Sequence, residues 1–195
     1  MKKQIFIING SGGVGKDEFV IMISNQCYKL IEKNNDYSYY KEWLKVKNYS
    51  SVTKVKEIAK IIGWDGSKTE KDRKFLSDLK LLTSQYNDMS MNDIKKCVNT
   101  FMNDKYEVDA KIMFIHIREV KEITRAVNEF KEYNAKTILV KRNSVKHITS
   151  NMADENVYNY NYDIVINNDG NMNDLEVIAK KFLKDFKNND FKKEY

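Results

Sequence analysis

The chain has 195 residues, a hydrophobic content of 42% and a formal net charge of +6. This length suits one α/β domain with a buried core, and no apolar run approaches the ~18 residues needed to cross a bilayer. The first residues turn polar too early for a secretion signal, so we expect a cytoplasmic protein that binds no membrane. Cys27 and Cys97 lack disulfide or zinc spacing, and we interpret both as reduced packing residues in helical patterns.

The positive charge does not by itself indicate a nucleic-acid partner. Lysines are spread along the whole chain among 28 acidic residues, whereas a nucleic-acid binder needs a clustered basic surface. Proline is absent, and Asn, Ile and Tyr are abundant, which indicates a general compositional bias. A site for a small anionic substrate needs only a local basic patch. We therefore rank nucleic-acid binding last among the functions considered.

The first predicted element is a buried strand at residues 4–8, which ends at Asn9. A helix is expected at about 15–33, because apolar residues recur there at helical spacing. Between them lies NGSGGVGKDEF, residues 9–19. This segment fits the phosphate-binding pattern G-x-x-x-x-G-K-[ST] at every fixed position except the last, where Asp17 replaces the hydroxyl residue.

Residues 34–109 are predicted to form a helical insertion, apart from a short strand candidate at about 43–49. Three segments carry helical patterns: 52–62, 71–86 and 93–102. Ser90 and Asp93 form an approximate capping box for the last of them.

Strand patterns return after the insertion. They cover residues 111–117, 137–140 and 163–166. A helix after the first of these is expected to run through Tyr133 and end at Asn134, and Asn171 is expected to cap a final amphipathic helix. The tail after Lys187 is expected to fray. Alternating strands and helices predict an α/β fold of three layers, with helices on both faces of a central parallel sheet and ligands beyond the carboxyl ends of its strands.

The glycine-rich segment has the chemistry of a phosphate site. Its four glycines allow successive amides to converge on an anion at the positive end of the next helix, and Lys16 reaches the outer phosphates. Asp17 could hold Mg²⁺ directly or through water. The alternatives are a tight turn with a solvated lysine, and an Asp17 that only favours the helix N-terminus.

The segment GSGGVGKDEF, residues 10–19, resembles the phosphate loop of phage-type deoxynucleoside monophosphate kinases and of animal-type phosphomevalonate kinases, two related branches of P-loop small-molecule kinases. Further along, DRKFLSDLK (72–80) resembles the arginine-bearing helix of their acceptor region, and IHIRE (115–119) resembles their strand ending in arginine. HIT (147–149) and DIVINNDGNMNDL (163–175) resemble their lid and their last strand with its adenine-side turn.

The resemblance implies a set of site residues. ATP phosphates and Mg²⁺ would be held by Gly10, Ser11, Gly12, Gly13, Val14, Gly15, Lys16 and Asp17, with Asp17 as the metal ligand. Arg73 and Arg118 would face the acceptor phosphate, and the turn containing Asn168 and Gly170 would lie near the adenine.

The resemblance also implies a lid at about 142–160, with Arg142, Lys146 and His147 closing over the transferred group and His147 contacting the acceptor. Lys16, Arg118 and Arg142 would then be the catalytic cations. His116 departs from the family, which tends to carry an acid there, so a second magnesium anchor is missing or is supplied by Glu119. A histidine inside an apolar strand is more often a hydrogen-bonded core residue.

The favoured hypothesis is that residues 1–195 form a single P-loop kinase domain, which transfers the terminal phosphoryl group of ATP to a small phosphorylated acceptor. The favoured acceptor is a nucleoside or deoxynucleoside monophosphate. Alternatives are a phosphomevalonate-type kinase and a catalytically weak, nucleotide-binding regulatory protein. The sequence leaves the oligomeric state open, a homodimer included.

Overall fold

The structure is a computed structural model that describes residues 1–33, 37–105, 107–145 and 157–195. It divides into two compact units: residues 1–48 with 105–195, and residues 49–104. The second unit is shorter than the insertion expected at 34–109, because residues 37–50 are largely strand. The two units are described separately.

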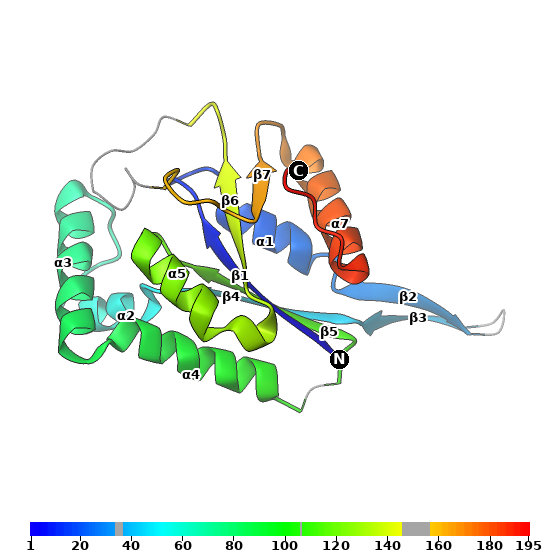
Figure 1. The fold of residues 1–195 in the computed structure, drawn as a ribbon, viewed down its shortest axis with the longest axis horizontal. Coiled ribbons are helices and arrows are strands. Elements are labelled where there is room, and N and C mark those ends of the chain that lie inside the picture. Colours follow the sequence, from blue (N-terminus) through cyan, green and yellow to red (C-terminus); the bar gives the residue numbers. More distant parts are fainter. Residues whose placement is uncertain (34–36, 106, 146–156) are drawn as a thin grey trace. The chain divides into compact units, whose positions relative to one another are not determined.

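The first unit is built on a five-stranded sheet in which all strands are parallel (Figure 1). Its strands are β1 (Lys2–Asn9), β4 (Leu44–Ser50), β5 (Ala110–His116), β6 (Lys136–Lys141) and β7 (Ile164–Asn167). Their order is β4-β5-β1-β6-β7, so the first strand is central. The predicted parallel α/β sheet is confirmed, and the carboxyl ends of β1, β5, β6 and β7 meet at one edge.

Helices cover the sheet. α1 (Lys16–Ser24) and α7 (Met172–Asn188) contact each other, and their buried apolar residues share one core cluster with Phe6 and Ile8 of β1. Neighbouring residues of a strand point to opposite faces, and Ile5 and Ile7 are also fully buried. The helix α5 (Val120–Glu129) covers this second face of the sheet. It contacts β1 and β6, and its buried residues do not belong to the core cluster of the first face.

The predicted helix at 15–33 is wrong beyond Ser24. Residues 28–33 form β2 (Tyr28–Lys33), which pairs antiparallel with β3 (Tyr37–Glu42) in a separate hairpin. The carbonyl of Cys27 accepts hydrogen bonds from the main-chain amides of Trp43 and Leu44, so the chain is already extended there and Cys27 is not helical. Antiparallel pairing with residues 37–42 overrides the helical spacing of the apolar residues.

Two predicted terminal residues are confirmed. Asn134 is left-handed, with φ 49°, but the helix before it is shorter than predicted: α5 ends at Glu129, and Asn134 follows a short 3₁₀ turn, η1 (Lys131–Tyr133). Asn171 caps α7 in a capping box with Asp174. Both positions have short polar side chains that tolerate such backbone conformations or bond the first helical amides.

The predicted fraying of the tail is wrong. The amide of Tyr195 donates to the carbonyl of Val165, and its carbonyl accepts from the amide of Asn167, which extends the edge of the sheet beside β7. Phe191 packs against Phe182, with ring centroids 5.3 Å apart. The apolar residues of the tail therefore complete the core, although its lysines gave it a polar appearance.

The second unit contains α2 (Thr53–Ile61), α3 (Glu70–Asn87) and α4 (Met89–Asn103), which contact one another. The three predicted helices are confirmed. The predicted cap at Ser90 is wrong, because α4 begins one residue earlier, after a left-handed Asp88. Asp93 instead accepts a hydrogen bond from the hydroxyl of Tyr49.

Candidate functional site

The glycine-rich loop joins the end of the central strand β1 to the start of α1. Three of its glycines have positive φ angles: 147° at Gly10, 81° at Gly13 and 91° at Gly15. Such angles are costly for residues with a side chain. The loop therefore has a conformation that its glycines make accessible, at the edge of the sheet where ligands of parallel α/β proteins bind.

Two glycines also lie too close to other segments to carry a side chain. A Cβ atom on Gly10 would lie 2.3 Å from the carbonyl oxygen of Val140 at the end of β6. A Cβ atom on Gly15 would lie 2.2 Å from the amide nitrogen of Asn168, which follows β7. The loop is thus packed closely against the ends of two strands.

Asparagines fix the two ends of the loop. The side chain of Asn9 accepts from the amide of Gly10 at 2.8 Å and donates to the Tyr162 hydroxyl at 2.7 Å and to the carbonyl of Arg118 at 3.2 Å. The side chain of Asn168 donates to the carbonyl of Val14 at 2.9 Å. Asn9, Val14, Tyr162 and Asn168 are all buried. These bonds preset the shape of the loop before any ligand arrives.

Lys16 points back over the loop. Its ammonium donates to the carbonyl oxygens of Gly10 and Ser11, at 2.6 and 2.7 Å. Ser11 is 1% exposed, and among the described residues its hydroxyl has no hydrogen-bond partner. A buried hydroxyl without a partner is costly. The loop therefore contains both a positive charge, on Lys16, and a hydroxyl donor without an acceptor, on Ser11. An anionic oxygen would interact favourably with both groups.

Asp17, Asn48 and His116 form a polar group beside the loop, which we call the Asp17 cluster. The amide nitrogen of Asn48 donates to Asp17 Oδ1 at 3.0 Å, and the amide oxygen of Asn48 lies 2.6 Å from His116 Nε2. His116 Nε2 is 3.6 Å from Asp17 Oδ1. The side chain of Asp17 is 72% exposed and that of His116 is 14% exposed. His116 is hydrogen-bonded as expected, but it is only partly buried and is not a core residue.

Two predicted basic residues lie near this edge of the sheet. Arg118 follows β5 and is exposed, and its carbonyl contacts Asn9. Arg142 follows β6, where its guanidinium donates to the Ser144 hydroxyl at 3.2 Å and to the carbonyl of Gly170 at 3.4 Å.

Arg73 belongs to the second unit, is exposed, and donates to the carbonyl of Lys68 at 3.2 Å. Lys146 and His147 lie outside the described residues.

The turn after β7 is bonded to its surroundings. Asn168 holds the glycine-rich loop, and Asp169 accepts from the amide and the side chain of Asn143, at 2.6 and 2.8 Å. Gly170 leaves no room for a side chain, because a Cβ atom would lie 2.4 Å from a carboxylate oxygen of Asp174. The turns after β6 and β7 are thus joined into one polar rim.

Sequence reasoning missed the contributions of Asn48 and Tyr162. Asn48 lies near the end of β4, and a strand candidate at 43–49 already placed it close to the ligand edge of a parallel sheet. Tyr162 gave no comparable signal, because it precedes β7 and reaches Asn9 only through the fold.

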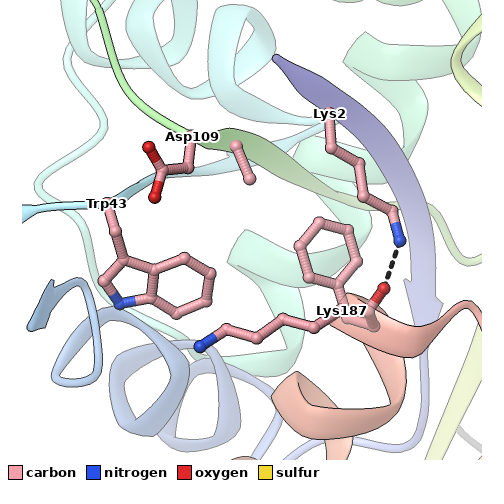
Figure 2. A pocket seen from close by; sticks show the side chains of 6 residues that line it. Lys2, Trp43, Asp109 and Lys187 are labelled. Atoms are coloured by element: carbon pink, nitrogen blue, oxygen red, sulfur yellow. Dashed lines mark hydrogen bonds between the residues drawn. The ribbon is translucent and has the colours of Figure 1, made fainter.

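A hollow lies at the opposite end of the sheet from the glycine-rich loop, where β1 and β5 begin (Figure 2). Lys187 lies over the ring of Trp43, with Nζ 3.8 Å from its centroid, and Lys2 donates to the carbonyl of Phe186. The lysines of this hollow therefore already have protein partners. We assign it a structural role in holding the end of α7 against the sheet.

No model of a known protein family matches the chain, and a search of curated proteins finds no significant match. None of the described helices combines the length and the hydropathy needed to cross a bilayer. Within the described part of the chain, no three His, Cys, Asp or Glu side chains are grouped so that they could hold a metal ion. Asp17 would therefore need ligand oxygens from a nucleotide or water to complete a magnesium shell.

Proposed function

We propose that this protein is an ATP-dependent kinase of the P-loop type, which transfers the terminal phosphoryl group of ATP to a small phosphorylated acceptor. The observation that carries the proposal is the position of Lys16 over a loop with three left-handed glycines and a buried, unpartnered Ser11 hydroxyl. Amides, an ammonium group and a free hydroxyl at the end of a central parallel strand match the needs of a polyphosphate.

The residues of this chain fit the roles that phosphoryl transfer requires. The reaction depends on alignment and on cations near the oxygens of the transferred group, rather than on a protein nucleophile. Lys16 would hold the outer phosphates, and Arg118 and Arg142 would contribute charge from the ends of β5 and β6. Bound Mg²⁺ would neutralise charge between the phosphates, with Asp17 as its protein ligand.

The acceptor we favour is a nucleoside or deoxynucleoside monophosphate, on the strength of the resemblance of residues 10–19 to such kinases. Phosphomevalonate is the alternative acceptor from the same resemblance. The same resemblance makes Arg73 the candidate contact for an acceptor phosphate, which an arginine can bind in a bidentate manner.

The test has two stages. Calorimetric titration with ATP in the presence of magnesium should show binding, and Lys16→Ala should abolish it. Lys180→Ala is the matched control, because Lys180 is an exposed lysine paired with Glu176 on α7. ADP release should then be measured with a panel of ribonucleoside and deoxyribonucleoside monophosphates and phosphomevalonate. We expect turnover with one acceptor class and a loss of about 100-fold or more in Lys16→Ala.

A nucleotide-binding regulatory protein is the second candidate, and the Asp17 cluster is the observation that favours it. His116 stands where the resembled kinases tend to carry an acid, and Asp17 is already bonded to Asn48. Binding of ATP without turnover on any acceptor, together with an ATP-dependent conformational change lost in Lys16→Ala, would favour this candidate over a kinase.

A further inference from the structure

Asn48 connects two residues of the site that come from different elements. It lies near the carboxyl end of β4, whereas Asp17 is in the first turn of α1 and His116 is the last residue of β5. Its side chain contacts both, with the amide nitrogen on Asp17 and the amide oxygen on His116. Three separate elements therefore converge on one asparagine.

The hydrogen-bond chemistry fixes the direction of this chain of contacts. An ionised carboxylate only accepts, so the group of Asn48 that faces Asp17 must be its NH₂. The oxygen of Asn48 then faces His116, and the 2.6 Å contact requires a proton on His116 Nε2. With its Nε2 donating, the imidazole orients the amide of Asn48 and does not present that nitrogen to a metal ion.

We propose that Asn48 is a positioning residue for the magnesium ligand Asp17, and that His116 fixes the orientation of Asn48. The inference rests on the proposed function and deepens it by assigning roles to two residues outside the glycine-rich loop. Asn48 would act through Asp17 and would not touch the nucleotide.

The exposure of Asp17 explains why a positioning contact matters. A 72% exposed carboxylate has rotamer freedom, which it loses when it binds an ion. Mg²⁺ demands near-octahedral geometry, and no second acid is grouped with Asp17 and His116 among the described residues. A single carboxylate beside a polyphosphate is therefore effective only if it is held where the ion will lie. Partners that orient metal ligands commonly change metal affinity by 10-fold to 100-fold.

The test measures metal dependence separately from nucleotide affinity. Nucleotide binding is measured by calorimetry in EDTA and over a magnesium titration, and Mn²⁺ binding to the nucleotide complex is followed by electron paramagnetic resonance. For Asn48→Leu we expect about 10-fold weaker Mn²⁺ binding and unchanged affinity in EDTA. Asn128→Leu, at an exposed position of α5, is the control for a surface asparagine.

The role of His116 is tested with a conservative pair of variants. Glutamine can place an amide N–H where Nε2 lies, whereas leucine cannot donate. His116→Gln should therefore retain Mn²⁺ affinity and His116→Leu should lose it. Because glutamine does not titrate near neutral pH, rescue would assign the effect to the hydrogen bond and not to a charge.

A double-mutant cycle tests whether Asn48 affects metal binding through Asp17. In an Asp17→Ala background, Asn48→Leu should change Mn²⁺ binding no further, because the ligand it positions is gone. Equal Mn²⁺ affinity in wild type and Asn48→Leu would overturn the inference while leaving the kinase proposal intact. If Asn48→Leu lost nucleotide affinity equally in EDTA and with metal present, the inference would also be overturned, since such losses would indicate a general structural role. If wild type binds no nucleotide, both proposals fail.

Discussion

The side-chain amide of Asn168 donates to the main-chain carbonyl of Val14, with 2.9 Å between Nδ2 and O. The two residues lie 154 positions apart in the chain, and both are buried. This bond ties the turn after β7 to the glycine-rich loop after β1. Gly15 permits the approach, because any side chain there would meet the Asn168 amide.

Substitution of Gly15 should therefore be more costly than substitution of Gly13. Both have positive φ angles, but an added Cβ on Gly13 meets nothing within 4 Å. Gly13→Ala should cost about 1–2 kcal/mol for the left-handed backbone alone. Gly15→Ala should cost about 2–4 kcal/mol, because displacement of Asn168 is added. Urea unfolding of the two variants measures the difference, and equal costs would show that the Asn168 contact is not rigid.

Removing the amide of Asn168 should loosen the glycine-rich loop. Asn168→Ala leaves the buried carbonyl of Val14 without its donor, which should lower the free energy of unfolding by about 1–3 kcal/mol. Asn168→Asp should be worse, because a carboxylate would face that carbonyl. Hydrogen exchange of the amides of residues 10–16 should increase in both variants. Unchanged exchange in Asn168→Ala would contradict the anchoring role.

Much of the sheet could be predicted from the sequence. The segments 4–8, 111–117, 137–140 and 163–166 are short apolar runs bounded by polar residues, and a strand buried on both faces needs only such a run. The glycine-rich loop was also predictable as a unit, because its conformation depends on residues that are adjacent in the chain. Its positive φ angles occur at Gly10 and Gly15, where the pattern requires glycine, and at Gly13, which stands at a variable position of the pattern.

The failures concern contacts that the periodicity of a single segment does not reveal. Residues 28–33 have apolar positions that suit a helix as well as a strand, and pairing with 37–42 in a hairpin decides between them. The tail of the chain has polar composition, but two aromatic residues, Phe191 and Tyr195, anchor it. The link between Asn48 and Asp17 spans 31 residues and two elements. No local pattern records such partners, because they become neighbours only in the folded chain.

The tail should contribute measurably to stability. Phe191 is packed against Phe6 and Phe182, and Phe191→Ala should lower the free energy of unfolding by about 2 kcal/mol. Lys192→Ala removes an exposed side chain that pairs with Asp190 at the surface, and should change stability by less than about 0.5 kcal/mol. Thermal unfolding monitored by circular dichroism compares the two. Equal melting temperatures for Phe191→Ala and wild type would mean that the tail does not pack on the core in solution.

Stability should decrease at alkaline pH because two buried acids resist ionisation. Burial, with a smaller contribution from Glu42, raises the pKa of the Cys27 thiol to about 11. Burial likewise raises the pKa of Tyr162 to about 12, against the opposing effect of its hydrogen bond with Asn9. Both groups titrate lower in an unfolded chain, near 8.5 for Cys and 10 for Tyr. As the pH rises through those values, the unfolded state loses protons that the folded state keeps, so unfolding becomes more favourable.

These two groups should thus leave the free energy of unfolding unchanged below about pH 8 and lower it between about pH 9 and 12, with about 3 kcal/mol from the thiol at most. Cys27→Ala removes the titrating group and should flatten the lower part of this slope, whatever its effect on stability at pH 7. Tyr162→Phe should make the upper part less steep without removing it, because the pKa values of Tyr49 and Tyr195 are also raised, mainly by burial. Urea titrations at several pH values provide the slopes. A slope in Cys27→Ala as steep as in wild type would show that the thiol is not held protonated by burial, and rapid reaction of Cys27 with a thiol reagent at pH 8 would lead to the same conclusion.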